Sequence, residues 1–307
     1  MLSRRQFIQS ASAAGATLAV QGTHKAMAQT EKKRTIVDAQ VHLWKAETED
    51  WKWVPGRKPQ LPEPFTIDKL VPMMDEAGVD RAVIVPPSWP GDRNDYALEA
   101  AQRYPKRFAV MGRIALDKPV STALLPKWKQ QPGMLGIRLT FQRDQASMLQ
   151  HADWVFPAAE KAGVPIMFFA PDNIPKFGPV AERHPGLTLI IDHMSLTLEI
   201  AKEDRIKPAI DEVVKLAKYP NVSVKVSWPV NFTKEPYPFR DMTDHIKRCF
   251  DAYGPQRCYW GTDLTNSLTK ATYRQRIEHF TKELSFLSEE DKDWVMGKAI
   301  LQRLGWT

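Results

Sequence analysis

This sequence lacks several motifs that are diagnostic of common protein classes. No glycine-rich phosphate loop follows the first β-branched segment, which argues against a doubly wound nucleotide-binding fold. No serine lies in a Gly-x-Ser-x-Gly elbow, which argues against a serine hydrolase. The formal net charge is +7, yet no basic cluster is interleaved with aromatic residues. We therefore do not expect nucleic acid as a partner.

The apolar run near the N-terminus is too short to cross a membrane. It covers residues 11–20, whereas a membrane-spanning helix needs ~20 apolar residues. The pair Arg4 and Arg5 precedes the run, and the small residues Ala26 and Ala28 follow it. This pattern resembles a twin-arginine export signal. We expect residues 1–28 to be such a signal, read by the twin-arginine machinery, with residues 29–307 folded in the periplasm and no membrane span.

Cysteine is scarce, since Cys249 and Cys258 are the only two. An oxidising periplasm permits a disulfide. However, Cys249 falls in a helical pattern and Cys258 in a strand pattern, and the sequence alone does not show that their geometry matches. We expect two buried thiols.

From residue 35 onward, strand-like and helix-like segments alternate. The strand-like segments are 35–43, 81–85, 108–113, 135–141, 165–169, 187–192, 221–227 and 258–262. The segments between them, including 67–77 and 124–130, are predicted to be helices. Eight such units in one domain predict an α/β fold of the (β/α)8 TIM-barrel type, with a doubly wound open sheet as the alternative.

Polar residues gather where these strands end. They are His42, Arg113, Arg138, His193, Lys225 and Asp263. Each one alone has a structural explanation, such as a hydrogen-bonded histidine or an arginine paired with an acid. Their convergence on the carboxyl end of a barrel favours an active site, because active sites lie there and the barrel interior is otherwise filled by apolar residues.

The first strand and the loop after it carry two further features. Strand alternation places Asp38, Gln40 and His42 on one face. The loop 45–66 is rich in proline and contains Trp51 and Trp53. Loops of this length are often functional, so it is either a lid or a surface segment whose tryptophans cover the barrel.

Several short motifs occur together in a fixed order. They are DAQVHLW at 38–44, GIR at 136–138, IDHM at 191–194, VSVKVS at 222–227, WGTD at 260–263 and GKAILQRLGW at 297–306. The ordered set resembles the amidohydrolase-related family of the amidohydrolase superfamily and covers nearly all of the chain after residue 35. It is most similar to the branch of metal-independent lactonases, which includes sugar-acid lactonases and 2-pyrone-4,6-dicarboxylate lactonase. The resemblance implies the same barrel.

One departure from the family pattern bears on metal binding. The family usually has His-x-His at the first strand, but Gln40 stands at the first of these positions. An amide oxygen is a poorer ligand for Zn²⁺ than an imidazole. His42, His193 and Asp263 could still hold one divalent ion with an open position. Because the related lactonases work without a metal, we expect none to be required.

The resemblance and the residue types together suggest a mechanism for opening a lactone. We expect Asp263 to be the general base that takes a proton from water. His42, His193 and the NH₂ group of Gln40 would stabilise the oxyanion. Arg113, Arg138 and Lys225 would bind an acidic group of the substrate.

Two other function classes stay open from the sequence. A metal-dependent decarboxylase or hydratase of an aromatic or unsaturated acid would need a bound divalent ion. A periplasmic binding protein would need no turnover, but such proteins are typically two-lobed around a hinge. The chain predicts one barrel, so we expect a hydrolase of carboxylic esters acting on a small anionic lactone. The sequence does not fix the ring or the oligomeric state.

Overall fold

The computed structural model describes residues 33–307, without the side chains of 119, 120 and 143–145. The predicted export signal, residues 1–28, lies outside the described residues and stays a prediction. Eight parallel strands follow one another in sheet order β1 to β8. They are β1 (Val37–Val41), β2 (Arg81–Ile84), β3 (Phe108–Gly112), β4 (Met134–Thr140), β5 (Ile166–Phe169), β6 (Leu189–Ile191), β7 (Val222–Lys225) and β8 (Cys258–Tyr259).

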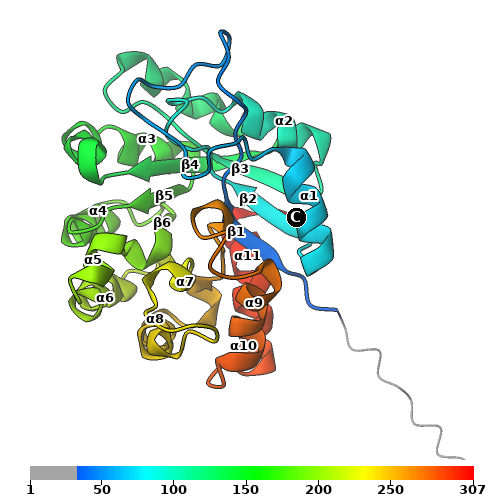
Figure 1. Cartoon of the computed structure of the whole chain (residues 1–307). Coiled ribbons are helices and arrows are strands. Elements are labelled where there is room, and N and C mark those ends of the chain that lie inside the picture. Colours follow the sequence, from blue (N-terminus) through cyan, green and yellow to red (C-terminus); the bar gives the residue numbers. More distant parts are fainter. Residues whose placement is uncertain (1–32) are drawn as a thin grey trace, which may run out of the picture. The chain divides into compact units, whose positions relative to one another are not determined.

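Helices surround these strands, as Figure 1 shows. They are α1 (Ile67–Ala77), α2 (Asp95–Arg103), α3 (Val155–Ala162), α4 (Phe177–Arg183), α5 (Leu198–Lys202), α6 (Ile206–Lys215), α7 (Pro229–Phe232), α8 (Thr243–Tyr253), α9 (Tyr273–Glu278), α10 (Glu289–Asp293) and α11 (Ala299–Leu304). The predicted helix 67–77 is confirmed. The segment 125–130, predicted as part of a helix over 124–130, is a 3-10 helix, a form that usually occurs in short segments.

Backbone hydrogen bonds bring the first strand beside the last. The amide of Ala39 donates to the Trp260 carbonyl (3.2 Å), and the amide of Asp263 donates to the Gln40 carbonyl (3.1 Å). The sheet order shows no switch in strand sequence, which a doubly wound sheet would require. The (β/α)8 barrel is therefore confirmed.

Apolar side chains fill the barrel interior and the layer outside it. Val83, Met111 and Ile190 belong to the interior cluster, which includes Trp306 from beyond the end of α11. Arg81, the first residue of β2, donates to the Trp306 carbonyl. The C-terminal segment therefore covers the amino-terminal ends of the strands. This leaves the opposite end of the barrel for polar side chains.

A β-bulge in β1 changes which side chains share a face. The register with β2 shifts between Asp38 and Val41. Val37 and Ala39 belong to the interior cluster, whereas Val41 packs in the outer layer. The expectation that strict alternation runs through this strand is therefore wrong. Bulges of this kind redirect side chains and are common beside active sites.

Asp38 is directed away from the predicted site. Its carboxylate accepts hydrogen bonds from the Thr262 amide (2.8 Å) and from the Tyr273 hydroxyl (2.7 Å). Tyr273 is the first residue of α9. Asp38 thus ties β1 to the segment after β8 and to α9, and it does not share a face with Gln40 and His42.

The two cysteines are buried and unpaired, as expected. Within residues 33–307, no helix combines the length and the apolar character that crossing a bilayer requires.

Candidate active site

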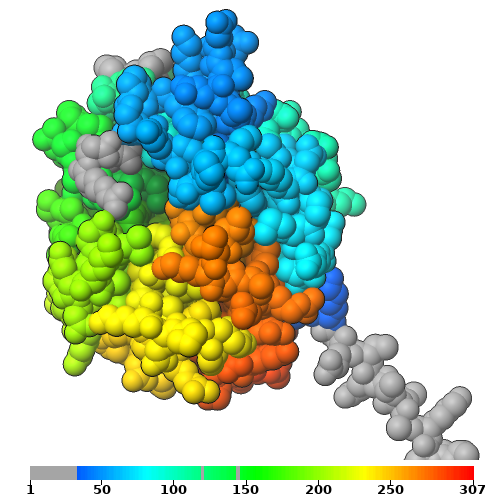
Figure 2. All heavy atoms as spheres, in the orientation of Figure 1, coloured from blue at the N-terminus to red at the C-terminus, as the bar shows by residue number. Residues whose placement is uncertain are grey.

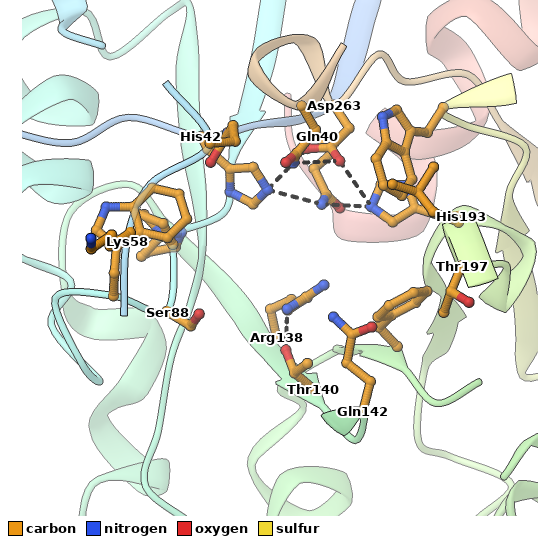
Figure 3. Close-up of a pocket in the computed structure, with 18 of the residues that line it drawn as sticks. Gln40, His42, Lys58, Ser88, Arg138, Thr140, Gln142, His193, Thr197 and Asp263 are labelled. Atoms are coloured by element: carbon orange, nitrogen blue, oxygen red, sulfur yellow. Dashed lines mark hydrogen bonds and ion pairs between the residues drawn. The ribbon is translucent and has the colours of Figure 1, made fainter. Parts of the chain in front are cut away.

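A cavity of about 430 Å³, here called the central pocket, opens at the carboxyl ends of the strands. Figure 3 shows Gln40, His42, His193 and Asp263 pointing toward one another, with Arg138 across the cavity. These five predicted site residues all line the central pocket. Arg113 lines a neighbouring cavity, and Lys225 lies buried beneath Gln40.

Left-handed backbone after three strands directs side chains into the central pocket. His193 follows β6 with φ 53°, Trp228 follows β7 with φ 64°, and Asp263 follows β8 with φ 48°. Such conformations are unfavourable for residues other than glycine, and they occur most often at functional sites. All three side chains line the central pocket.

The hydrogen bonds of His42 fix the orientation of its ring. Its Nδ1 lies 2.7 Å from the Val85 carbonyl oxygen, which can only accept. Nδ1 therefore carries a proton and donates. The opposite nitrogen, Nε2, lies 2.9 Å from Oδ1 of Asp263. A proton on Nε2 would make His42 an imidazolium paired with that carboxylate.

The two carboxylate oxygens of Asp263 contact different side chains. Its Oδ2 accepts from Nδ2 of Asn266 at 2.8 Å. Its Oδ1 is buried and lies 2.9 Å from Nε2 of His42. Burial alone would raise the pKa of Asp263, but the charge and contact of His42 outweigh it and hold the pKa well below its usual range. Asp263 is therefore ionised at neutral pH.

Lys225 determines how Gln40 is oriented. The ammonium of Lys225 donates to Oε1 of Gln40, and an ammonium cannot accept. The amide NH₂ must therefore face the imidazoles. It lies 2.9 Å from Nε2 of His193 and 3.5 Å from Nε2 of His42.

His193 is a hydrogen-bond acceptor in this arrangement. Its Nε2 receives the amide of Gln40, and its Nδ1 lies 2.8 Å from the Ser227 hydroxyl. Burial lowers the pKa of His193 from 6.5 to about 4, against the opposing charges of Asp263 and Asp192. A neutral His193 that accepts from Gln40 cannot also donate from Nε2 to an oxyanion. The geometry therefore does not support the donor role expected from the sequence.

One buried carboxylate balances two cations beside the central pocket. Asp192 lies 2.7 Å from the Lys225 ammonium and 3.0 Å from Nε of Arg138. Burial would raise the pKa of Asp192, but these two charges lower it. Arg138 also donates to Thr140. Lys225 is fully buried, so the structure gives it a supporting position under Gln40 and not the predicted contact with substrate.

Arg113 lies in a second cavity of about 350 Å³, here called the side pocket. Arg138 and Thr140 line both pockets. Asn94 holds the backbone of Arg113 at both its amide (2.7 Å) and its carbonyl (2.9 Å). Burial, reinforced by the charge of Arg138, lowers the pKa of Arg113 to about 10. The guanidinium is therefore still charged at neutral pH.

The residues at the centre do not fit the zinc site considered from the sequence. Zinc would require the Nε2 lone pair of His193, but the NH₂ of Gln40 occupies it, and Lys225 fixes that orientation. The buried ammonium would also repel a divalent cation. Across residues 33–307, no group of three or more His, Cys, Asp or Glu side chains is arranged to hold a metal ion.

Several residues that line the central pocket were not predicted from the sequence, and three of them come from the segments after β1 and β8. Lys58 and Gln60 come from the loop 45–66, and Asn266 lies three residues after Asp263. Gln60 Nε2 donates to the Thr265 hydroxyl at 2.6 Å. Figure 2 shows the blue loop segment meeting the orange segment that follows β8. The loop thus forms part of the pocket wall, which strand periodicity cannot reveal.

Comparison with known proteins identifies relatives over most of the chain. The family model described as amidohydrolase matches residues 37–302. An L-fucono-1,5-lactonase from Burkholderia ambifaria is 25% identical over 74% of this chain and 79% of its own length. A 4-sulfomuconolactone hydrolase from Hydrogenophaga intermedia is 26% identical over 75% of this chain and 74% of its own. The crystal structure of an amidohydrolase from Burkholderia multivorans with bound zinc has a TM-score of 0.74 at 19% identity, over 88% of this chain and 99% of its own.

Proposed function

The chain belongs to the amidohydrolase family, and we propose that it is a hydrolase that opens the lactone ring of a small acidic molecule by attack of water. One observation carries the proposal. Asp263 lines the central pocket and holds an ionised carboxylate whose Oδ1 lies directly beside Nε2 of His42. The relatives from Burkholderia ambifaria and Hydrogenophaga intermedia, both lactone hydrolases, support this reaction class.

The residues of the central pocket can perform each step of lactone hydrolysis. Oδ1 of Asp263 takes a proton from water while the water oxygen bonds to the lactone carbonyl carbon. The carbonyl oxygen becomes an oxyanion, which the second N–H of Gln40 stabilises, together with His42 when its Nε2 carries a proton. The ring C–O bond then breaks, and the alkoxide leaving group takes the proton from Asp263. The product is an open hydroxy acid.

His193 and Lys225 act on this chemistry through Gln40. Lys225 holds the amide oxygen, and His193 accepts one amide hydrogen. The second hydrogen of the NH₂ group faces Nε2 of His42 at the longer distance of 3.5 Å, and a substrate oxygen would receive it by replacing that contact. We therefore assign both side chains a positioning role, and no step of the reaction needs a metal.

The alternative of a metal-dependent decarboxylase or hydratase has less support. Such an enzyme needs a bound divalent ion, and the hydrogen bonds between Gln40 and His193 oppose one. A binding protein without turnover is also disfavoured. The chain has a single barrel, and the ionised carboxylate beside a histidine suits catalysis.

The experiment compares lactone hydrolysis by the wild-type protein and Asp263→Asn. Titrating the acid released from a panel of δ- and γ-lactones gives kcat and KM. We expect kcat to fall by about 10²- to 10⁴-fold, because a positioned general base contributes that much. Asp68→Asn, on the exposed side of α1, is the matched control. An Asp263→Asn protein with the wild-type rate would refute the role of Asp263.

A further inference from the structure

The proposed base and the proposed oxyanion donor lie on the two strands that meet where the barrel closes. Gln40 belongs to β1, and Asp263 follows β8. We call residues 38–40 and 260–263 the β1–β8 junction. The amide of Asp263 donates to the Gln40 carbonyl across it, at 3.1 Å. The distance between the base and the oxyanion donor therefore depends on how this junction is held.

One buried carboxylate, that of Asp38, joins the two sides of the junction. Its Oδ1 accepts the backbone amide of Gln40 at 3.1 Å and that of Thr262 at 2.8 Å. The first amide belongs to the proposed oxyanion donor, and the second belongs to the residue directly before Asp263. Because a single oxygen atom holds both amides, a shift of either strand would lengthen or bend one of the two hydrogen bonds.

The second oxygen of Asp38 fixes the carboxylate itself. Oδ2 accepts the hydroxyl of Thr262, and it accepts that of Tyr273 at 2.7 Å. Asp38 is fully buried, and burial raises the pKa of its carboxyl against the hydrogen bonds from Thr262 and Tyr273. An apolar side chain at this position would avoid that unfavourable burial. The carboxylate is therefore accounted for by the groups that it holds in place.

The junction is also packed too closely for a side chain at Gly261. A Cβ atom added there would lie 3.3 Å from the amide nitrogen of Gln40 and 3.3 Å from Cβ of Ala39. Because contacts this short are rare, one methyl group would move β1 away from the segment after β8 by a few tenths of an ångström. Close backbone packing and Asp38 together set the spacing across the junction.

We propose that Asp38 is a positioning residue of the active site, which sets the place of Gln40 relative to Asp263 by holding both sides of the junction on one oxygen. This inference rests on the proposed function. Asp38 is fully buried and lies outside the central pocket, so it acts on the reaction through the backbone of Gln40 and Thr262. A displacement of about 1 Å between reacting groups can lower a rate by about 10²-fold.

The test compares Asp38→Leu with Asp38→Asn, measuring kcat and KM with the best substrate of the lactone panel. Leucine is similar in size but has no acceptor, so both backbone amides lose their partner. We expect kcat to fall by about 10- to 100-fold, while KM changes little because the pocket walls stay in place. Asparagine keeps one oxygen for the two amides, and its NH₂ can donate to the hydroxyls of Thr262 and Tyr273. Asp38→Asn should therefore retain most of the wild-type kcat.

Asn221→Leu is the matched control for a purely structural role. Asn221 is buried directly before β7, at the end of the barrel opposite the central pocket. Its amide donates to the backbone carbonyls of Ala181, His184 and Leu187. The change to leucine removes these backbone contacts, as Asp38→Leu does at the junction. We expect both variants to unfold at lower urea concentration than the wild-type protein, but only Asp38→Leu to lose kcat.

Gly261→Ala keeps the test decisive if Asp38→Leu does not fold. The added methyl group separates the two sides of the junction and leaves Asp38 unchanged, so kcat should fall by about 10-fold. A wild-type kcat in either folded variant would overturn the inference, as would equal losses in Asp38→Asn and Asp38→Leu. These results would leave the lactonase proposal standing. No hydrolysis of any lactone by the wild-type protein would instead refute the proposed function itself.

Discussion

The central pocket and the side pocket share Arg138 and Thr140 as a wall, but their charged side chains are paired to different extents. In the central pocket, charged and polar groups face one another: Asp263 lies beside His42, and the amide of Gln40 faces His193. In the side pocket, the ion-pair partner of Arg113 is Asp92, whose Oδ1 lies 3.5 Å from its Nε. Paired groups hold each other in fixed positions, which catalysis requires. An incompletely paired cation is suited to binding an anion.

The paired region extends below the central pocket. Lys225, Asp192 and Arg138 form a buried chain of ion pairs that ends on Gln40. Such a network is weak evidence for stability as a whole, but removing one member leaves a buried charge without its partner. Comparable substitutions in the two pockets should therefore have unequal effects.

The largest expected effect comes from Lys225→Met. The change leaves Oε1 of Gln40 without a donor and Asp192 with one cation instead of two. We expect the free energy of unfolding to fall by about 3 kcal/mol, as for other broken buried ion pairs. Urea unfolding followed by circular dichroism measures this loss.

Arg113→Met is the matched control for that measurement. It also replaces a buried cation by an apolar side chain of similar length. However, the ion pair of Arg113 with Asp92 is longer, at 3.5 Å, and its carboxylate is more exposed than that of Asp192. We expect its free energy of unfolding to change by less than about 1 kcal/mol. Equal losses in Lys225→Met and Arg113→Met would remove the distinction between the two pockets.

A smaller effect should appear when stability is measured against pH. Burial lowers the pKa of His193 from 6.5 to about 4. Between these values the unfolded chain binds a proton at this residue and the folded protein does not, so acidification favours unfolding. The contribution of His193 should decrease by about 2 kcal/mol from about pH 7 to about pH 5.

Comparing His193→Asn with Arg113→Met isolates this effect. His193→Asn should lose less stability on acidification than the wild-type protein, because the titrating group is gone. Arg113→Met should follow the wild-type protein over the same range. An unchanged pH dependence in His193→Asn would show that His193 is not held neutral by burial.

Periodicity predicted the barrel because each strand is a short apolar segment followed by a helix. It also located the site, since the carboxyl ends of the strands converge in any such barrel. It failed at Asp38, where a bulge redirects the side chain, and at Lys225, whose burial under Gln40 depends on packing. Asn266 and the side pocket were not predicted because they depend on turns and on the loop 45–66, which have no repeating pattern.

The most direct test of the account is lactone hydrolysis after complete removal of metal. The wild-type protein would be treated with a strong chelator, its zinc and manganese measured by elemental analysis, and kcat determined with the best substrate of the lactone panel. The account predicts that the metal-free protein keeps its rate, because Asp263, His42 and Gln40 supply the base and the oxyanion donors. Loss of activity on chelation and its return with one zinc ion per chain would contradict it.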